Sequence, residues 1–136
     1  MQTDFEILGR KLVDAYPAIA EKLITNPILT DFSHIPDIVK IIYQQPQVSN
    51  TTNTKKVEYL VAVIIKLYDP DLFTGYKRKM KTGLRRELNK YIPGTPTYIS
   101  NIYKKVDSLF NIYKSFNVEV NNIVSEISSK FTEASN

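Results

Sequence analysis

The stretch "KKVEYLVAVIIKLY", residues 55–68, decides between a helical fold and a sheet fold for this chain. Its many β-branched residues are compatible with a strand, but its apolar residues also recur at helical spacing. Fourteen residues exceed a typical strand, Thr54 precedes them as a helix cap, and no other segment offers a strand partner. We therefore predict a helix, and its apolar stripe makes it the central helix of a bundle. The stripe consists of Val57, Leu60, Val61, Ile64, Ile65 and Tyr68.

Two amphipathic helices are predicted on the N-terminal side of this segment. "TDFE" at residues 3–6 has the form of a capping box, in which Thr3 begins the first helix. Pro17 either kinks that helix or opens another one. "HIPDIVKIIYQQ" at residues 34–45 is the second, with Ser33 as its cap. The apolar face of the first helix is Phe5, Leu8, Leu12 and Tyr16, and that of the second is Ile35, Ile38, Val39 and Ile42.

Positive charge is concentrated in residues 76–92, which we predict to form a basic helix. Met80, Leu84 and Leu88 would share its buried side, while the cations cover the opposite side. Such a face can bind phosphates, and it equally suits an acidic protein partner, an anionic membrane surface or solvent. The cations on this face are Arg78, Lys79, Lys81, Arg85, Arg86 and Lys90.

The C-terminal part, from residue 97 to 131, has the most regular periodicity in the sequence. Nine apolar residues recur at alternating steps of three and four, which is a heptad seam. One continuous helix of this length would be a rod of roughly 45 Å that overhangs the shorter helices before it. The seam therefore either completes a closed monomeric bundle or packs against another subunit. Its members are Ile99, Ile102, Val106, Leu109, Tyr113, Phe116, Val120, Ile123 and Ile127.

Residues with the chemistry of an active site are scarce. The chain has no cysteine and one histidine, His34, and its four glycines do not cluster into a phosphate-binding loop. Asp69 and Asp71 lack the rest of a calcium loop, so we interpret them as turn and cap residues. We expect no catalytic residues, no metal and no cofactor, and thus a protein that is not an enzyme.

Length and targeting signals are simple to interpret. A chain of 136 residues is the size of one domain that buries its own core. The N-terminus "MQTDFEILGR" lacks the features of an export signal, and the apolar run "YLVAVII" at 59–65 is too short to span a bilayer. We expect a soluble chain made in the cytoplasm of its host cell, without a transmembrane segment.

The sequence is also rich in isoleucine, lysine, asparagine and tyrosine. In this respect, and in the segment "KKVEYLVAVIIKLYDPDLF" at 55–73, it resembles small helical virion proteins of tailed bacteriophages, including the crAss-like phages. The resemblance implies a non-enzymatic subunit of a capsid, portal or tail that is associated with the virion. No motif allows individual residues to be assigned a role from it.

Taken together, these patterns predict an all-α protein with a helical bundle over residues 1–92 and a long C-terminal helix over 97–136. We expect a structural subunit that uses its heptad face to bind other protein subunits, the same or different. The alternative is a small basic helical protein that binds nucleic acid through residues 77–90.

Overall fold

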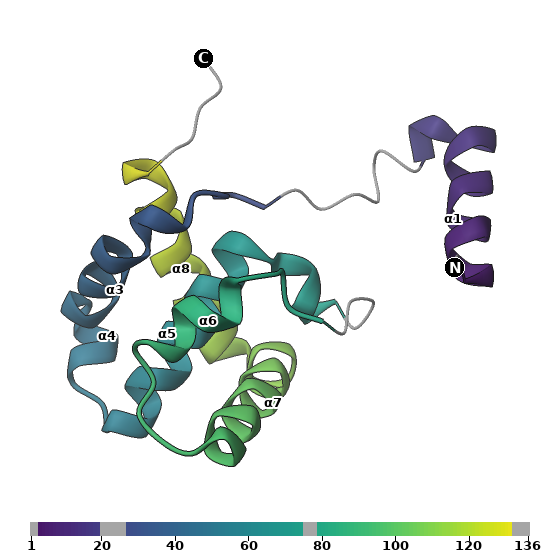
Figure 1. Cartoon of the computed structure of the whole chain (residues 1–136). Coiled ribbons are helices and arrows are strands. Elements are labelled where there is room, and N and C mark those ends of the chain that lie inside the picture. The colour runs from purple at the N-terminus through teal and green to yellow at the C-terminus, as the bar shows by residue number, and fades with distance from the viewer. Residues whose placement is uncertain (1–2, 20–26, 75–78, 132–136) are drawn as a thin grey trace.

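The fold is all-α, as the sequence predicts. The computed structural model describes residues 3–19, 27–74 and 79–131, and these residues form helices and connecting turns but no strand. Figure 1 shows a bundle of helices over residues 27–131, with the N-terminal helix α1 standing apart from it.

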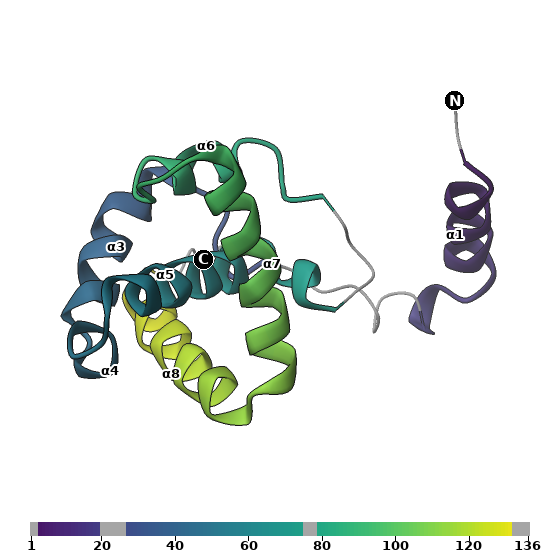
Figure 2. The ribbon, with the colours of Figure 1, turned by 90° about the horizontal axis from the view of Figure 1, so that it is seen from below.

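Helix α5 (Asn53–Tyr68) is the centre of the bundle. The prediction of a helix over 55–68 is confirmed, although the cap is Thr52, whose hydroxyl accepts the backbone N–H of Lys55. The middle of the helix, residues 57–65, is buried throughout. Figures 1 and 2 show why: α3, α6, α7 and α8 surround α5 on all sides. The β-branched residues therefore belong to a helix that is buried on all sides.

Helix α3 (Ile35–Gln44) packs one apolar face on α5. Its predicted face of Ile35, Ile38, Val39 and Ile42 is buried. A short 3₁₀ turn, η1 (Phe32–His34), precedes it, and the cap is the carboxylate of Asp31, which accepts the backbone N–H of Ser33. The prediction that Ser33 is the cap is wrong. After α3 comes the one-turn helix α4 (Pro46–Ser49).

The predicted basic helix over residues 76–92 is wrong. After the 3₁₀ turn η2 (Pro70–Phe73), the helical part of this segment is only α6 (Leu84–Asn89), and residues 75–78 lie outside the described residues. Gly83 precedes α6 with φ +87°, a left-handed conformation that ends any helix arriving from the N-terminal side. Leu84 and Leu88 are nevertheless buried, because α6 turns this side toward α5.

The single C-terminal helix over 97–131 is also wrong. The chain forms α7 (Pro96–Ile112) and α8 (Lys114–Lys130), separated at Tyr113, whose backbone is extended. A rod of more than 30 residues would project beyond α5, which has only 16. By folding back, the chain lays two helices of 17 residues along α5 and buries apolar residues of both halves.

Helix α1 (Asp4–Ala15) begins at the predicted cap, where the Thr3 hydroxyl accepts the backbone N–H of Glu6 at 3.1 Å. It ends before Tyr16, and residues 17–19 are helical again, so that Pro17 opens a new helical turn. None of the residues of α1 is buried. The core instead begins at Leu29, and the buried side chains before and after residues 93–96 belong to one cluster.

Candidate functional site

The six predicted cations do not form one helical face, because only Arg85 and Arg86 lie on α6. Lys79 and Lys81 precede it, Lys90 follows it, and Arg78 lies outside the described residues. The described cations are thus spread along residues 79–90, before, on and after the short helix α6.

Three of these cations contact groups of the same chain. The Lys81 ammonium lies 5.6 Å from the centre of the Phe32 ring. The Arg85 guanidinium lies 5.1 Å from the centre of the Tyr103 ring on α7 and donates to the Ser100 hydroxyl at 3.1 Å. Lys90 pairs with Glu87 at 3.1 Å. These contacts hold three of the cations against the chain itself, although Arg85 and Lys90 remain exposed, as do Lys79 and Arg86.

Asp69 positions the start of this segment. Its carboxylate is buried and accepts the backbone N–H of Lys81 at 2.7 Å. Sequence reasoning treated Asp69 as a turn residue and missed this contact, which joins positions twelve residues apart. The predicted turn and cap roles are confirmed for both residues, since Asp69 is the N-cap of η2 and the carbonyl of Asp71 accepts from both the backbone and the hydroxyl of Thr74.

Tyr103 connects α7 to α6. Its hydroxyl donates to the Asn89 side chain at 2.6 Å, and its ring carries Arg85 on one face. Burial raises the pKa of Tyr103 to about 12, although the nearby Arg85 charge acts in the opposite direction. The phenol is therefore neutral at physiological pH and serves as a hydrogen-bond donor rather than as a base.

The predicted heptad seam packs inside the chain. Seven of its nine residues are buried, Leu109 is partly buried against the same core, and Tyr113 is exposed at the break between α7 and α8. Helices α7 and α8 present the seam to α5 and to each other. The face that the sequence offered as a subunit interface is therefore occupied by the chain's own central helix.

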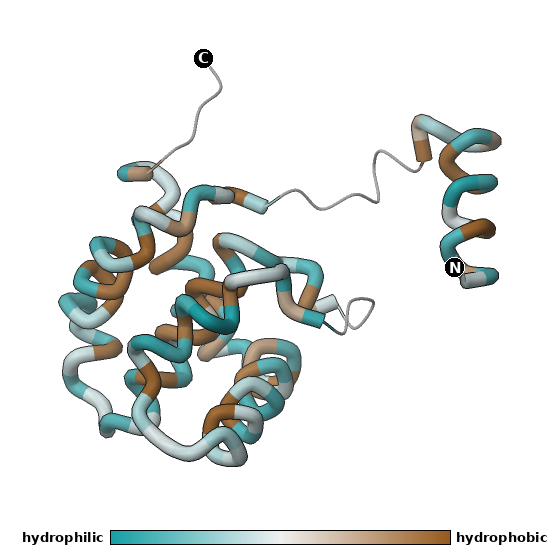
Figure 3. The backbone as a smooth tube through the Cα atoms, viewed as in Figure 1, coloured by the Kyte–Doolittle hydropathy of each residue, from teal (hydrophilic) through white to brown (hydrophobic). Residues whose placement is uncertain are grey.

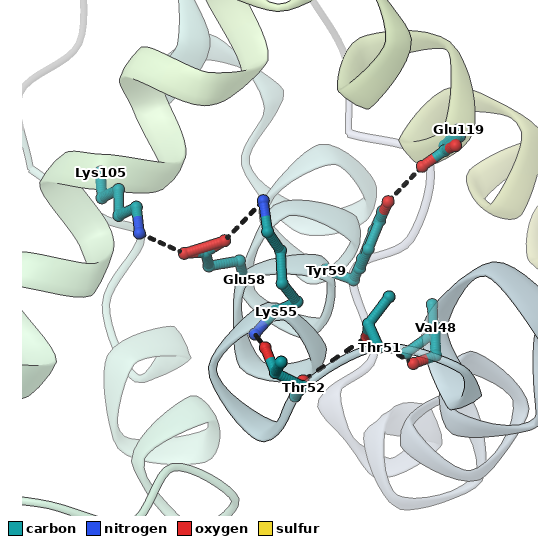
Figure 4. Close-up of polar contacts among 8 residues, drawn as sticks. All are labelled: Val48, Thr51, Thr52, Lys55, Glu58, Tyr59, Lys105 and Glu119. Carbon is teal, nitrogen blue, oxygen red and sulfur yellow. Dashed lines mark hydrogen bonds and ion pairs between the residues drawn. The ribbon is translucent and has the colours of Figure 1, made fainter.

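Glu58 is a charged residue in the middle of the apolar core. It has no exposed surface, and the Lys105 and Lys55 ammonium groups lie 2.9 Å and 3.9 Å from its two carboxylate oxygens (Figure 4). Among the described residues, neither oxygen accepts a hydrogen bond of good geometry, so its compensation is ionic. The sequence contained a signal for this site, because Glu58 is an acidic residue inside an apolar run. Helical periodicity alone did not reveal it.

The neighbouring residue Tyr59 makes the corresponding contact with α8. Its hydroxyl donates to the Glu119 carboxylate (Figure 4), and its ring packs against Phe116. Burial raises the pKa of Tyr59 above its ordinary value, and the hydrogen bond to Glu119 adds to this effect. Glu58 and Tyr59 thus hold α7 and α8 to α5, and both act structurally.

No catalytic constellation is formed by the described side chains. The His34 ring is tilted against the Phe131 ring with 5.3 Å between their centres, and it lies 3.8 Å from the Asp31 carboxylate. The sequence contains no second histidine and no cysteine. Within residues 3–19, 27–74 and 79–131, no three acidic or histidine side chains gather as metal ligands.

Several exposed apolar side chains lie on α1. Phe5, Leu8 and Leu12 are spaced by three and four residues, so they share one face, and they are 86%, 52% and 49% exposed. Figure 3 shows the brown apolar bands of α1 at a distance from the described helices of the bundle. We refer to these three residues as the α1 stripe. Sequence reasoning found the stripe but assigned it to the bundle.

Comparisons with known proteins identify no relative. No family model matches the chain, and neither a curated protein nor a solved structure is significantly similar to it. In the part of the chain that the structure describes, no helix has the length and apolar character needed to cross a bilayer.

Proposed function

We propose that this chain is a non-enzymatic structural subunit that joins a larger protein assembly through helix–helix contacts made by α1. The observation that carries the proposal is the exposed α1 stripe on a helix that contributes no buried residue to the core. The setting implied by the resemblance to virion proteins is a tailed-phage particle.

We therefore assign the docking surface to α1 and not to the C-terminal seam. A charge introduced at Leu109 or Phe116 would now disrupt the chain's own core, since these residues are packed within it. A charge on the α1 stripe would leave that core intact, because the stripe lies outside it.

A partner for α1 is also expected on energetic grounds. A helix of 12 residues is marginal in water by itself, and burial of an amphipathic face is what usually stabilises it. Spacings of three and seven residues from Phe5 are those by which helices anchor in apolar grooves of other proteins. Each anchor that becomes buried would contribute about 1.5–3 kcal/mol.

The nucleic-acid interpretation has less support. Lys81, Arg85 and Lys90 already contact aromatic or acidic groups of the same chain. Acidic residues of α1 would also repel an anionic surface, since Asp4, Glu6 and Asp14 outnumber its two basic residues.

The proposal is tested by site-specific photo-crosslinking in material from the natural source. A photoreactive residue at Leu8 is expected to give discrete adducts with particular subunits of one assembly, because this position faces the partner. The same residue at Asp14, on the polar side of α1, is the control and should give weak, unspecific labelling. Equal labelling from both positions, or none from Leu8, would refute docking through α1.

A further inference from the structure

A second exposed apolar patch lies on the bundle, at the corner where α7 turns into α8. Ile112 and Tyr113 are adjacent there and are 72% and 57% exposed. Figure 2 shows this corner at the lower edge of the bundle, where no other described element covers it. Tyr113 belongs to the predicted seam, so the break in the helix is what turns an apolar seam residue outward.

The charges around the two patches are complementary. Residues 1–26 hold four acidic and three basic residues, whereas residues 27–131 hold nine acidic and fifteen basic residues. At the corner, Lys114 follows Tyr113 directly, and the Lys66 ammonium lies 5.2 Å from the centre of the Phe110 ring. Asp107 and Glu119 are the acidic residues within two turns of the corner on α7 and α8, and their carboxylates accept from Asn111 and Tyr59. The N-terminal part thus has one acidic residue in excess and the body has six basic residues in excess, and this difference in sign favours contact between them.

We propose that the α1 stripe of one copy of this chain docks on the Ile112–Tyr113 corner of the next copy. The inference rests on the proposed docking role of α1 and names its partner and its receiving surface. Because the two surfaces differ, each copy can use its stripe on one neighbour and its corner on another, and repetition of this head-to-tail contact builds a ring or an open filament.

Pairing of two α1 helices explains the structure less well. It would leave Ile112 and Tyr113 exposed and would bring two helices with an excess of acidic residues together. The head-to-tail contact covers both patches, and every copy contributes to two interfaces.

The test uses the purified full-length chain in sedimentation velocity over about 1–300 μM, the range in which a small interface of this kind associates. We expect the chain itself to form oligomers larger than dimers as concentration rises. Leu8→Glu and Ile112→Glu should each be monomeric, with association weakened by about 100-fold or more. Arg10→Gln and Lys104→Gln change the net charge by the same amount away from the two patches and should still associate.

The decisive measurement mixes the two monomeric variants. Ile112→Glu retains an intact α1, and Leu8→Glu retains an intact corner, so a head-to-tail contact predicts a one-to-one complex that grows no further. The proposal is overturned if the mixture forms no complex. It is also overturned if Ile112→Glu self-associates normally, which would mean that two α1 helices pair. The proposal is also overturned if the full-length chain stays monomeric. It is overturned as well if both variants lower the unfolding midpoint, which would mean that α1 folds back onto its own chain. After any of those results, docking of α1 on a different protein would still be tested by the crosslinking experiment at Leu8.

Discussion

At the scale of single residues, the stability of the core depends on positive charge close to the buried carboxylate of Glu58. A carboxylate with no exposed surface loses its hydration, and this cost is offset only by nearby positive charge. Lys105 supplies the closer contact from α7, and its side chain is half exposed, so the ammonium stays hydrated while its charge reaches inward. The pair therefore ties the orientation of α7 to α5.

Replacing Lys105 with methionine should destabilise the chain by about 1–3 kcal/mol, since it leaves a buried charge with only the more distant Lys55 beside it. Urea unfolding measures the change in free energy. Lys104→Met is the matched control, because Lys104 is an exposed neighbour on the same helix. Adding Glu58→Gln to Lys105→Met should recover part of the loss by removing the charge. Equal stability of the two lysine variants would contradict this role for Lys105.

At the scale of elements, the turn between α7 and α8 is held by Asn117. Its side-chain amide donates to the carbonyl of Phe110 at 3.1 Å, a group that the end of α7 would otherwise leave without an intrahelical partner. Asn121 donates to the Asn117 side-chain oxygen at 2.8 Å and fixes its orientation. One side chain on α8 thus satisfies the end of α7 across the break.

Asn117→Ala should lower the free energy of unfolding by about 1–2 kcal/mol, because it leaves a part-buried carbonyl without its donor. Chemical denaturation of the variant beside Asn122→Ala, an exposed asparagine on the same helix, provides the comparison. If the two substitutions lower the free energy of unfolding equally, the break between α7 and α8 is stabilised by packing alone.

At the scale of the whole molecule, the chain divides into a packed body and a helix outside it. The body is closed around α5 from Leu29 onward, where the backbone N–H groups of Ile28 and Leu29 both donate to the carbonyl of Leu67. Helix α1 adds nothing to that core. Association and folding stability should therefore be separable by shortening the chain.

A chain shortened to residues 27–136 should keep its free energy of unfolding within about 0.5 kcal/mol of the full-length value, since the described residues that it loses, 3–19, are all exposed. A chain shortened to residues 30–136 is the control and should lose about 2 kcal/mol or more, because Leu29 is fully buried. Calorimetry or denaturant unfolding reports both. A large loss in the longer of the two shortened chains would mean that α1 packs on the body.

The sequence by itself determined where apolar faces lie. Periodicity identified the central helix, the buried face of α3, the cap at Thr3 and the residues of the C-terminal seam, because helical spacing and capping depend on neighbours within a few positions. It also identified the α1 stripe and the two leucines of α6 that are buried.

Only the tertiary structure decided what those faces meet. The seam breaks at Tyr113 because α5 is half as long as the predicted rod, and this length match is a property of packing, which periodicity cannot report. The basic segment bends because Gly83 adopts a left-handed backbone and Asp69 binds Lys81 from twelve residues away. The α1 stripe stays exposed because the bundle closes without it. Short-range pattern specifies which side of a helix is apolar, and long-range geometry selects the surface that covers it.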